Sequence, residues 1–217
     1  MDLFCANLQI EVGAKRMRSF LLFFTVFLSI TANASIIQLD FTQDYVGYKN
    51  QPNSGSISVN GNGSALSMLG NNWALFEGPF DISADTVFEF SFSSSIIGEV
   101  QGFGFDSDKT FHSTDDYRLG TNRFFQLAGS QMFGIQDYNN YATPGDAKVY
   151  TVEVGKYVTG MFKYIVFMND QDAKGEVSQS SFFINNVGQA GVVTVSESGT
   201  FYLVLFALCL LLVKRKV

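Results

Sequence analysis

Hydrophobic and polar residues alternate most regularly over residues 86–93, where Phe88, Phe90 and Phe92 are separated by polar side chains. A period of two places the three rings on one face of a β-strand and the polar residues on the other. Residues 98–106 repeat this pattern after a turn rich in Ser and Gly. Because two such strands cannot cover their own rings, a second sheet is expected to pack on them and form a sandwich core.

Short apolar segments separated by turn residues continue along the chain and predict roughly eleven strands. The Asn-Gly pairs of residues 60–63 and the Gly-Asn-Asn of residues 70–72 are interpreted as turns between neighbouring strands. The predicted strands span residues 36–41, 56–59, 65–69, 73–76, 86–93, 99–106, 124–128, 132–135, 148–154, 162–168 and 180–187. The segments 45–55 and 107–122 are polar and are expected to be loops, the second long enough to suggest a role.

The expected fold class is therefore all-β, an antiparallel β-sandwich of the jelly-roll type. High aromatic content, with 23 Phe, and 20 Gly suit many short strands and tight turns. Residues 35–190 contain 8 Lys and Arg against 17 Asp and Glu, so this portion is acidic. An acidic body argues against nucleic acid or anionic lipid as a partner, and suits a neutral ligand or a bound cation.

The N-terminal residues have the features of a secretory signal. Lys15, Arg16 and Arg18 supply the positive region, an apolar stretch covers residues 20–30, and Ala-Asn-Ala at 32–34 matches a cleavage site. We therefore predict a signal peptide over residues 1–34, with an N-terminal signal helix and Met17 as a plausible true start. An uncleaved membrane anchor is the alternative. Cys5 and Cys209 lie outside the expected body, so no disulfide framework is predicted for it.

The C-terminal residues 191–217 are predicted to be a linker followed by a sorting or transmembrane tail that forms a hydrophobic helix. An apolar run at 201–213, shorter than the roughly twenty residues of a typical spanning helix, precedes the basic residues 214–216. With Val-Ser-Glu-Ser at 195–198, this tail resembles the PEP-CTERM sorting signals of exported bacterial proteins, whose usual motif is Val-Pro-Glu-Pro. The resemblance implies export by a Gram-negative bacterium, transient anchoring in the inner membrane, and a sorting protease (an exosortase) as partner. The protein would then reach the cell surface or extracellular matrix. A plain single-pass anchor is the alternative.

The sequence offers little for catalysis. His112 is the only histidine, and no nucleophile elbow accompanies it, so a Ser/His/Asp group is not indicated. Paired carboxylates such as Glu99 and Asp106 would allow glycoside hydrolysis only at a suitable separation, which the sequence does not give. The chain is expected not to be an enzyme.

Two Asp-x-Asp pairs are candidate calcium ligands, because alternate carboxylates at a strand end can direct oxygens at one hard cation. They are Asp106 with Asp108, and Asp170 with Asp172. The alternative is ordinary turn chemistry, since Asp favours turns and strand ends.

Aromatic and amide side chains outside the alternating pattern suit sugar recognition. An aromatic face covers the C–H side of a pyranose, and neighbouring planar polar groups bind its hydroxyls. The candidate ligand-binding residues are Trp73, Arg123, Gln126, Asp137, Tyr138, Asn139 and Tyr141. Trp73 is either a platform for the sugar or part of the core, and the others are alternatively ordinary surface residues of a turn.

Several segments resemble the carbohydrate-binding β-sandwich modules of secreted bacterial polysaccharide-degrading enzymes. They are residues 72–73, 82–92, 98–106, 122–131, 134–138, 154–157, 167–172 and 181–187. The resemblance implies a non-catalytic module that binds a neutral polysaccharide, here standing alone with a sorting tail. The alternatives are a structural cell-surface or biofilm-matrix protein without a small ligand, and a glycoside hydrolase or lyase.

Overall fold

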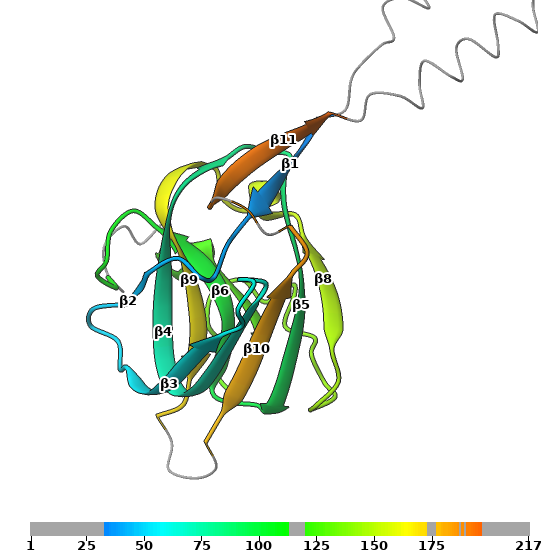
Figure 1. Cartoon of the computed structure of the whole chain (residues 1–217). Coiled ribbons are helices and arrows are strands. Elements are labelled where there is room, and N and C mark those ends of the chain that lie inside the picture. The colour runs from blue at the N-terminus through cyan, green and yellow to red at the C-terminus, as the bar shows by residue number, and fades with distance from the viewer. Residues whose placement is uncertain (1–32, 113–119, 173–176, 187, 189, 197–217) are drawn as a thin grey trace, which may run out of the picture. The chain divides into compact units, whose positions relative to one another are not determined.

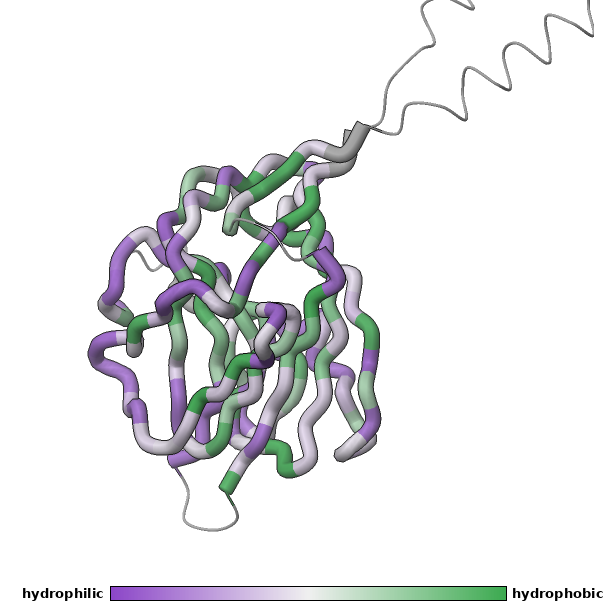
Figure 2. The backbone as a smooth tube through the Cα atoms, in the orientation of Figure 1, coloured by the Kyte–Doolittle hydropathy of each residue, from purple (hydrophilic) through white to green (hydrophobic). Residues whose placement is uncertain are grey.

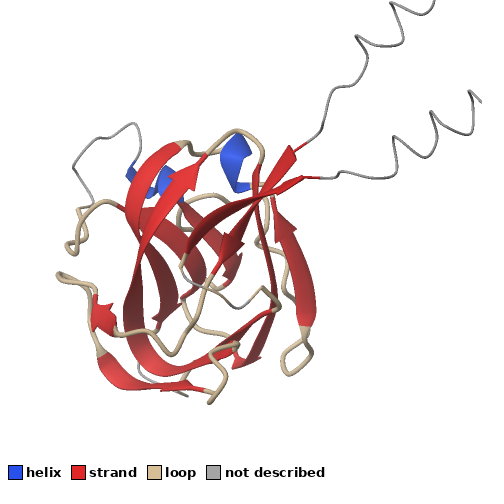
Figure 3. Cartoon of the chain, turned by 45° about the horizontal axis from the view of Figure 1, so that its top comes forward, coloured by secondary structure: helices blue, strands red, loops and turns tan. Residues whose placement is uncertain are grey.

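Strands dominate the part of the chain that the computed structural model describes, namely residues 33–112, 120–172, 177–186, 188 and 190–196 (Figures 1 and 3). The strands are β1 (Asn33–Gln38), β2 (Tyr45–Gly47), β3 (Ser54–Val59), β4 (Ala65–Ile82), β5 (Thr86–Ile96), β6 (Val100–Asp106), β7 (Phe124–Ala128), β8 (Lys148–Val152), β9 (Gly160–Asp170), β10 (Gln179–Ile184) and β11 (Gly191–Ser196). Two short 3-10 helices accompany them, η1 (Gly120–Arg123) and η2 (Val154–Lys156). The all-β class predicted from the alternation is confirmed.

The strands form an open mixed sheet in the order β11-β1-β5-β10-β4-β9-β6-β7, with β8 paired to β5 and both β2 and β3 paired to β4. The first part of β4 pairs with β3 and β10, and its second part pairs with β2 and β9. Strand β4 thus belongs to two layers, β3-β4-β10-β5-β8 and β2-β4-β9-β6-β7. This arrangement is consistent with a β-sandwich.

Phenylalanine rings from the two layers meet in the core, as the alternation predicted. Phe88 and Phe90 of β5 pack edge-to-face on Phe103 of β6, with ring centroids 5.1 and 5.4 Å apart. Phe167 of β9 meets Phe182 of β10 at 4.8 Å. All five rings are buried, which supplies the main apolar stabilisation of a body without disulfides. Figure 2 shows hydrophobic positions spread along the strands, whereas the loops carry most hydrophilic positions.

The predicted turn at residues 70–72 is wrong, because β4 runs unbroken from Ala65 to Ile82. Gly70 has φ +76°, and Asn71 and Asn72 are buried. These residues therefore mark where the strand passes from one layer to the other, a role that uses the same turn-favouring residue types.

Three other expectations differ from the structure. The pairing is not wholly antiparallel, since β1 pairs in parallel with β5 through Ser35↔Thr86 and Ile36↔Val87. Residues 132–135 form a loop and not a strand: Ile135 alone makes a parallel bridge to Phe125 of β7, and the Phe133 backbone N donates to Gln126 Oε1. Residues 45–47 and 191–196, expected to be loop and linker, form β2 and β11.

The described strands belong to one compact unit, Ala34–Val195. The predicted signal helix and C-terminal hydrophobic helix lie outside the described residues. Within the described ranges, the structure contains no helix of the length and apolarity needed to cross a membrane.

Candidate functional site: an acidic cluster and a tyrosine surface

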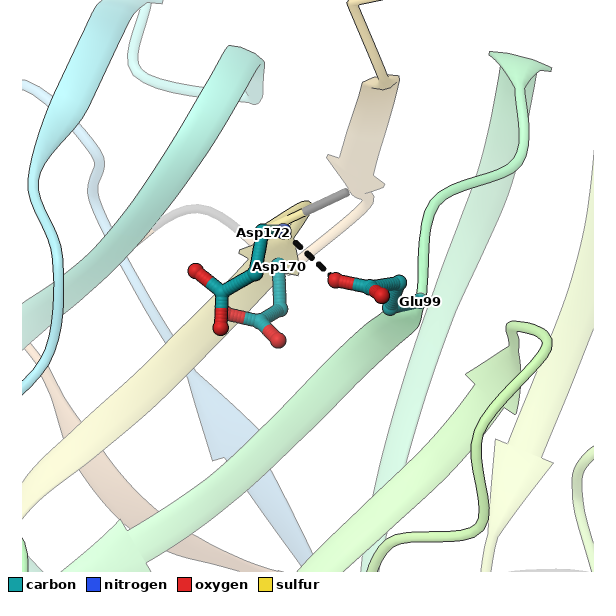
Figure 4. A group of neighbouring side chains, drawn as sticks. All are labelled: Glu99, Asp170 and Asp172. Atoms are coloured by element: carbon teal, nitrogen blue, oxygen red, sulfur yellow. Dashed lines mark hydrogen bonds between the residues drawn. The ribbon is translucent and has the colours of Figure 1, made fainter. Parts of the chain in front are cut away.

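Three carboxylates converge where β9 ends and β6 begins. The register Val100↔Asp170 places Glu99 beside Asp170, and the Glu99 amide N donates to the Asp170 carbonyl at 2.9 Å. Asp172 follows two residues later, and its backbone N donates to Glu99 Oε2 at 2.5 Å. Figure 4 shows the Asp170 and Asp172 side chains beside each other, with the Glu99 carboxylate directed toward them. One oxygen from each residue lies within 4.8 Å of the others.

Neutral donors from β4 contact this acidic cluster, defined as Glu99, Asp170 and Asp172. Trp73 Nε1 donates to Asp170 Oδ1 at 3.0 Å, and Asn71 Nδ2 donates to Asp172 Oδ1 at 2.7 Å. Both donors come from the segment where β4 changes layer. The cluster therefore joins β4, β6 and β9 at one end of the body.

Burial raises the pKa of Asp170 above its ordinary value, and the neighbouring charges of Asp172 and Glu99 raise it further. Hydrogen bonds from Trp73 and Asn71 act in the opposite direction. The shift upward means that the ionised Asp170 carboxylate is disfavoured in this environment. A bound cation would relieve that cost, and the oxygen-only ligand set is the type that calcium accepts.

The other Asp-x-Asp pair forms no comparable group. Asp106 pairs with Tyr164 at the opposite end of the β6–β9 ladder, six residues and therefore about 20 Å from the Val100↔Asp170 pair. It accepts hydrogen bonds from Tyr48 Oη and from Arg123 Nη2, the latter at 2.8 Å, within the buried interior. Its Oδ1 accepts from the backbone N atoms of residues 107 and 108. The metal prediction for Asp106 is corrected: it is a buried ion-pair residue that also shapes a turn.

Asp108 is an exposed turn residue. It accepts a hydrogen bond from the Thr110 backbone N at 2.6 Å and lies 3.6 Å from His112 Nε2. The predicted calcium ligands thus divide, with Asp170 and Asp172 inside the acidic cluster and Asp106 and Asp108 outside it.

Four of the predicted sugar-contacting residues are buried, which corrects their assignment to a binding surface. For Trp73, expected to be either a platform or part of the core, the core alternative holds: it is 2% exposed among other aromatic rings. Arg123 is held by Asp106, and Gln126 bonds to the backbone of Gln131 and Phe133. Tyr141 packs edge-to-face on Phe92, with its hydroxyl within hydrogen-bond distance of backbone atoms of residues 94 and 146.

Asp137, Tyr138 and Asn139 lie at the surface together with Tyr157, which the sequence analysis did not select. The Tyr138 and Tyr157 rings are 6.0 Å apart at 69°, and Tyr157 also packs edge-to-face on Phe125. Asn139 Nδ2 bonds to Gln136 Oε1 at 2.9 Å. We call Asp137, Tyr138, Asn139 and Tyr157 the tyrosine surface.

Tyr157 follows η2 and is held in place by Asp137. Its hydroxyl donates to Asp137 Oδ2 at 2.7 Å, and this hydrogen bond is the main reason that the pKa of Tyr157 is raised. The hydroxyl is therefore neutral at physiological pH. Tyr157 as a whole is 36% exposed, so it can contact a partner while Asp137 fixes its position.

The candidate carboxylates for hydrolysis do not face each other. Glu99 precedes β6 and Asp106 ends it, seven residues later, so they lie about 23 Å apart along an extended strand. Glycosidase carboxyl pairs are separated by roughly 5–10 Å. These two residues cannot act as such a pair.

Comparison with known proteins gives no relative. No family model, curated protein or solved structure matches the chain. Three residues of these sites were not predicted for them: Tyr157 in the tyrosine surface, Glu99 in the acidic cluster and Asn71 in contact with that cluster. Pairing between distant segments brings them there. The position of Tyr157 directly after Val-Gly-Lys, a typical turn sequence, could have indicated a surface tyrosine. Its contact with Asp137 could not be predicted, because Asp137 lies twenty residues earlier in the sequence.

Proposed function

We propose that this chain is an exported, surface-associated β-sandwich of the jelly-roll type that binds a neutral polysaccharide without cleaving it. The tyrosine surface is the contact region. Export and sorting at residues 1–34 and 195–217 belong to the same proposal and are supported by the sequence patterns of those segments.

The exposed ring of Tyr157 is the observation that carries this proposal. A partly exposed aromatic face fixed by a hydroxyl–carboxylate bond provides apolar contact to sugar C–H groups at low cost in side-chain entropy. The exposed Asp137 carboxylate and the partly exposed Asn139 amide supply nearby hydrogen-bonding groups for sugar hydroxyls. A neutral ligand is favoured because the body is acidic and would repel an anionic polymer.

Affinity electrophoresis of the full chain against a panel of neutral polysaccharides tests the proposal. We expect retardation by at least one polysaccharide, and we expect Tyr157→Ala to weaken binding roughly tenfold, since about 1.5 kcal/mol of aromatic contact corresponds to one decade of affinity. The matched control is Tyr45→Ala, which removes a 42% exposed tyrosine on β2 outside the tyrosine surface. Its binding should equal that of the unmodified chain.

Retention of no polysaccharide would contradict the proposal. Equal losses in Tyr157→Ala and Tyr45→Ala would also contradict it, because the effect would then not be specific to the tyrosine surface.

A second candidate function is that of a structural surface or matrix protein. It is supported by the sheet face formed by β3, β4, β10 and β5. The register places Ser58, Ser67, Ser181 and Ser93 in one row across β3, β4, β10 and β5. Phe183, 41% exposed, lies in the next row. A partly apolar, hydroxyl-rich sheet face suits self-association. Concentration-dependent sedimentation that is abolished by Phe183→Lys would support this function, and a monomer at all concentrations would exclude it.

A further inference from the structure

We propose that Glu99, Asp170 and Asp172 bind a calcium ion, with the amide oxygen of Asn71 as a fourth protein ligand. This site is separate from the tyrosine surface, and its test does not depend on glycan binding.

The distances among the carboxylates suit one calcium ion. Calcium–oxygen distances are about 2.3–2.6 Å, so two oxygens on the same ion lie no more than about 5 Å apart. The three carboxylates meet this limit, with one oxygen of each within 4.8 Å of the others (Figure 4). A single ion can therefore take one oxygen from each carboxylate.

Asn71 provides an independent indication of a ligand. It is only 5% exposed, and its amide faces the cluster through the 2.7 Å hydrogen bond from Nδ2 to Asp172 Oδ1. Its amide oxygen is buried and accepts no hydrogen bond from any described residue. A buried amide oxygen without a donor is costly. A half-turn about χ2 exchanges the two amide atoms and directs this oxygen at the carboxylates, where only a cation makes it favourable.

The chemistry of the four side chains selects calcium among common cations. All ligands are carboxylate or amide oxygens, which zinc sites with their His and Cys ligands do not resemble. Asn71 lies inside β4, Glu99 directly precedes β6 and Asp170 ends β9, whereas Asp172 is exposed. Such an irregular, partly open set suits the flexible six- to eight-oxygen shell of calcium better than the near-ideal octahedron of magnesium.

Bound calcium would join three chain segments at one end of the body. Asn71 lies where β4 changes layer, Glu99 precedes β6, Asp170 ends β9, and Asp172 begins the connection to β10. The ion would replace repulsion among three carboxylates by attraction to a common charge. We therefore expect it to stabilise the fold.

The test is thermal unfolding of the full chain in EGTA, in about 5 mM CaCl2 and in about 5 mM MgCl2, concentrations above the roughly 0.1–1 mM Kd of extracellular calcium modules. Trp73 supplies a second measurement on the folded protein, because it is the sole tryptophan and its Nε1 bonds to Asp170. We expect calcium to raise the Tm by several degrees and to change Trp73 fluorescence. Magnesium should do less.

Variants separate the cluster from general salt effects. Asp170→Asn and Asp172→Asn should lose most of the calcium-dependent Tm shift, whereas the matched control Asp108→Asn, from the other Asp-x-Asp pair, should keep it. In EGTA, Asp170→Asn should be at least as stable as the unmodified chain, because it removes one of three carboxylates that lie within 4.8 Å of one another. In CaCl2, the unmodified chain should be the more stable of the two.

Three results would overturn the proposal. The first is a Tm and a Trp73 fluorescence that calcium leaves unchanged. The second is a calcium shift retained in both Asp170→Asn and Asp172→Asn. The third is an equal response to magnesium.

Discussion

Asp106 and Arg123 show how much a single buried charge depends on its partner. Both side chains are less than 10% exposed, and Arg123 Nη2 lies 2.8 Å from Asp106 Oδ2. Such a pair adds little net stability, but removal of one member leaves an uncompensated charge in the interior. This is why a residue that resembles a metal ligand in sequence has a structural role in the fold.

Arg123→Met is expected to lower the free energy of unfolding by about 3–5 kcal/mol, because Asp106 loses its counter-charge. Lys163→Met is the control, since the Lys163–Glu77 pair is more than half exposed and is worth at most about 1 kcal/mol. Urea unfolding of both variants measures the difference. Equal costs would show that burial does not determine the value of the Asp106–Arg123 pair.

Tyr150 is a buried tyrosine whose hydroxyl bonds to no described residue. Burial, with a smaller contribution from Tyr141, raises its pKa from 10.0 to about 12. A folded-state pKa above the unfolded value means that stability present below pH 10 is lost as the pH rises toward 12, because the unfolded chain ionises first.

Tyr150→Phe should therefore reduce the loss of unfolding free energy between pH 9 and pH 11.5 or so, and should be neutral or slightly stabilising at pH 7, because it removes an unpaired hydroxyl. Denaturant unfolding at the two alkaline pH values measures this. An alkaline loss as large in Tyr150→Phe as in the unmodified chain would contradict the assignment.

At the scale of elements, β5 and β6 could be predicted from the sequence because Phe88 to Phe105 alternate with polar or small residues. The continuity of β4 could not be predicted, because residues 70–72 have the composition of a turn, and pairing with β3 and β9 keeps them extended. The parallel β1–β5 pair is a long-range contact with no local signal.

Gly70 is the position on which the layer change of β4 depends. An added Cβ would strain φ +76° and lie 2.7 Å from the Ser54 carbonyl oxygen. Gly70→Ala should cost about 2–4 kcal/mol, from left-handed strain of about 1 kcal/mol and a clash with backbone. Gly145→Ala, at φ +90° with open space around it, should cost only the strain. Thermal unfolding compares the two, and similar costs would contradict the role given to Gly70.

At the scale of the whole molecule, the described strands form a body joined to predicted export segments. The β1–β5 register begins at Ser35↔Thr86, so cleavage after Ala34 would keep this pairing intact. We expect N-terminal sequencing of the exported protein to begin at Ser35. A sequence that begins upstream of the apolar stretch 20–30 would indicate an uncleaved anchor.

The candidate sites were only partly predictable at this scale. Asp170, Asp172, Asp137 and Tyr138 were recognisable by residue type and loop position. Their partners Glu99, Asn71 and Tyr157 come from segments far apart in sequence, and the burial of Trp73 and Tyr141 results from packing between layers. Residue type indicates the chemistry of a site, whereas the fold determines which side chains reach the surface.

An NMR titration of the full chain with a retained neutral oligosaccharide is the sharpest test of glycan binding at the tyrosine surface, because it locates the contact on the protein. We expect backbone amide shifts concentrated at residues 137–140 and at Tyr157, with little change along β3 or β10. Shifts confined to residues outside the tyrosine surface, or none with any polysaccharide class, would contradict it.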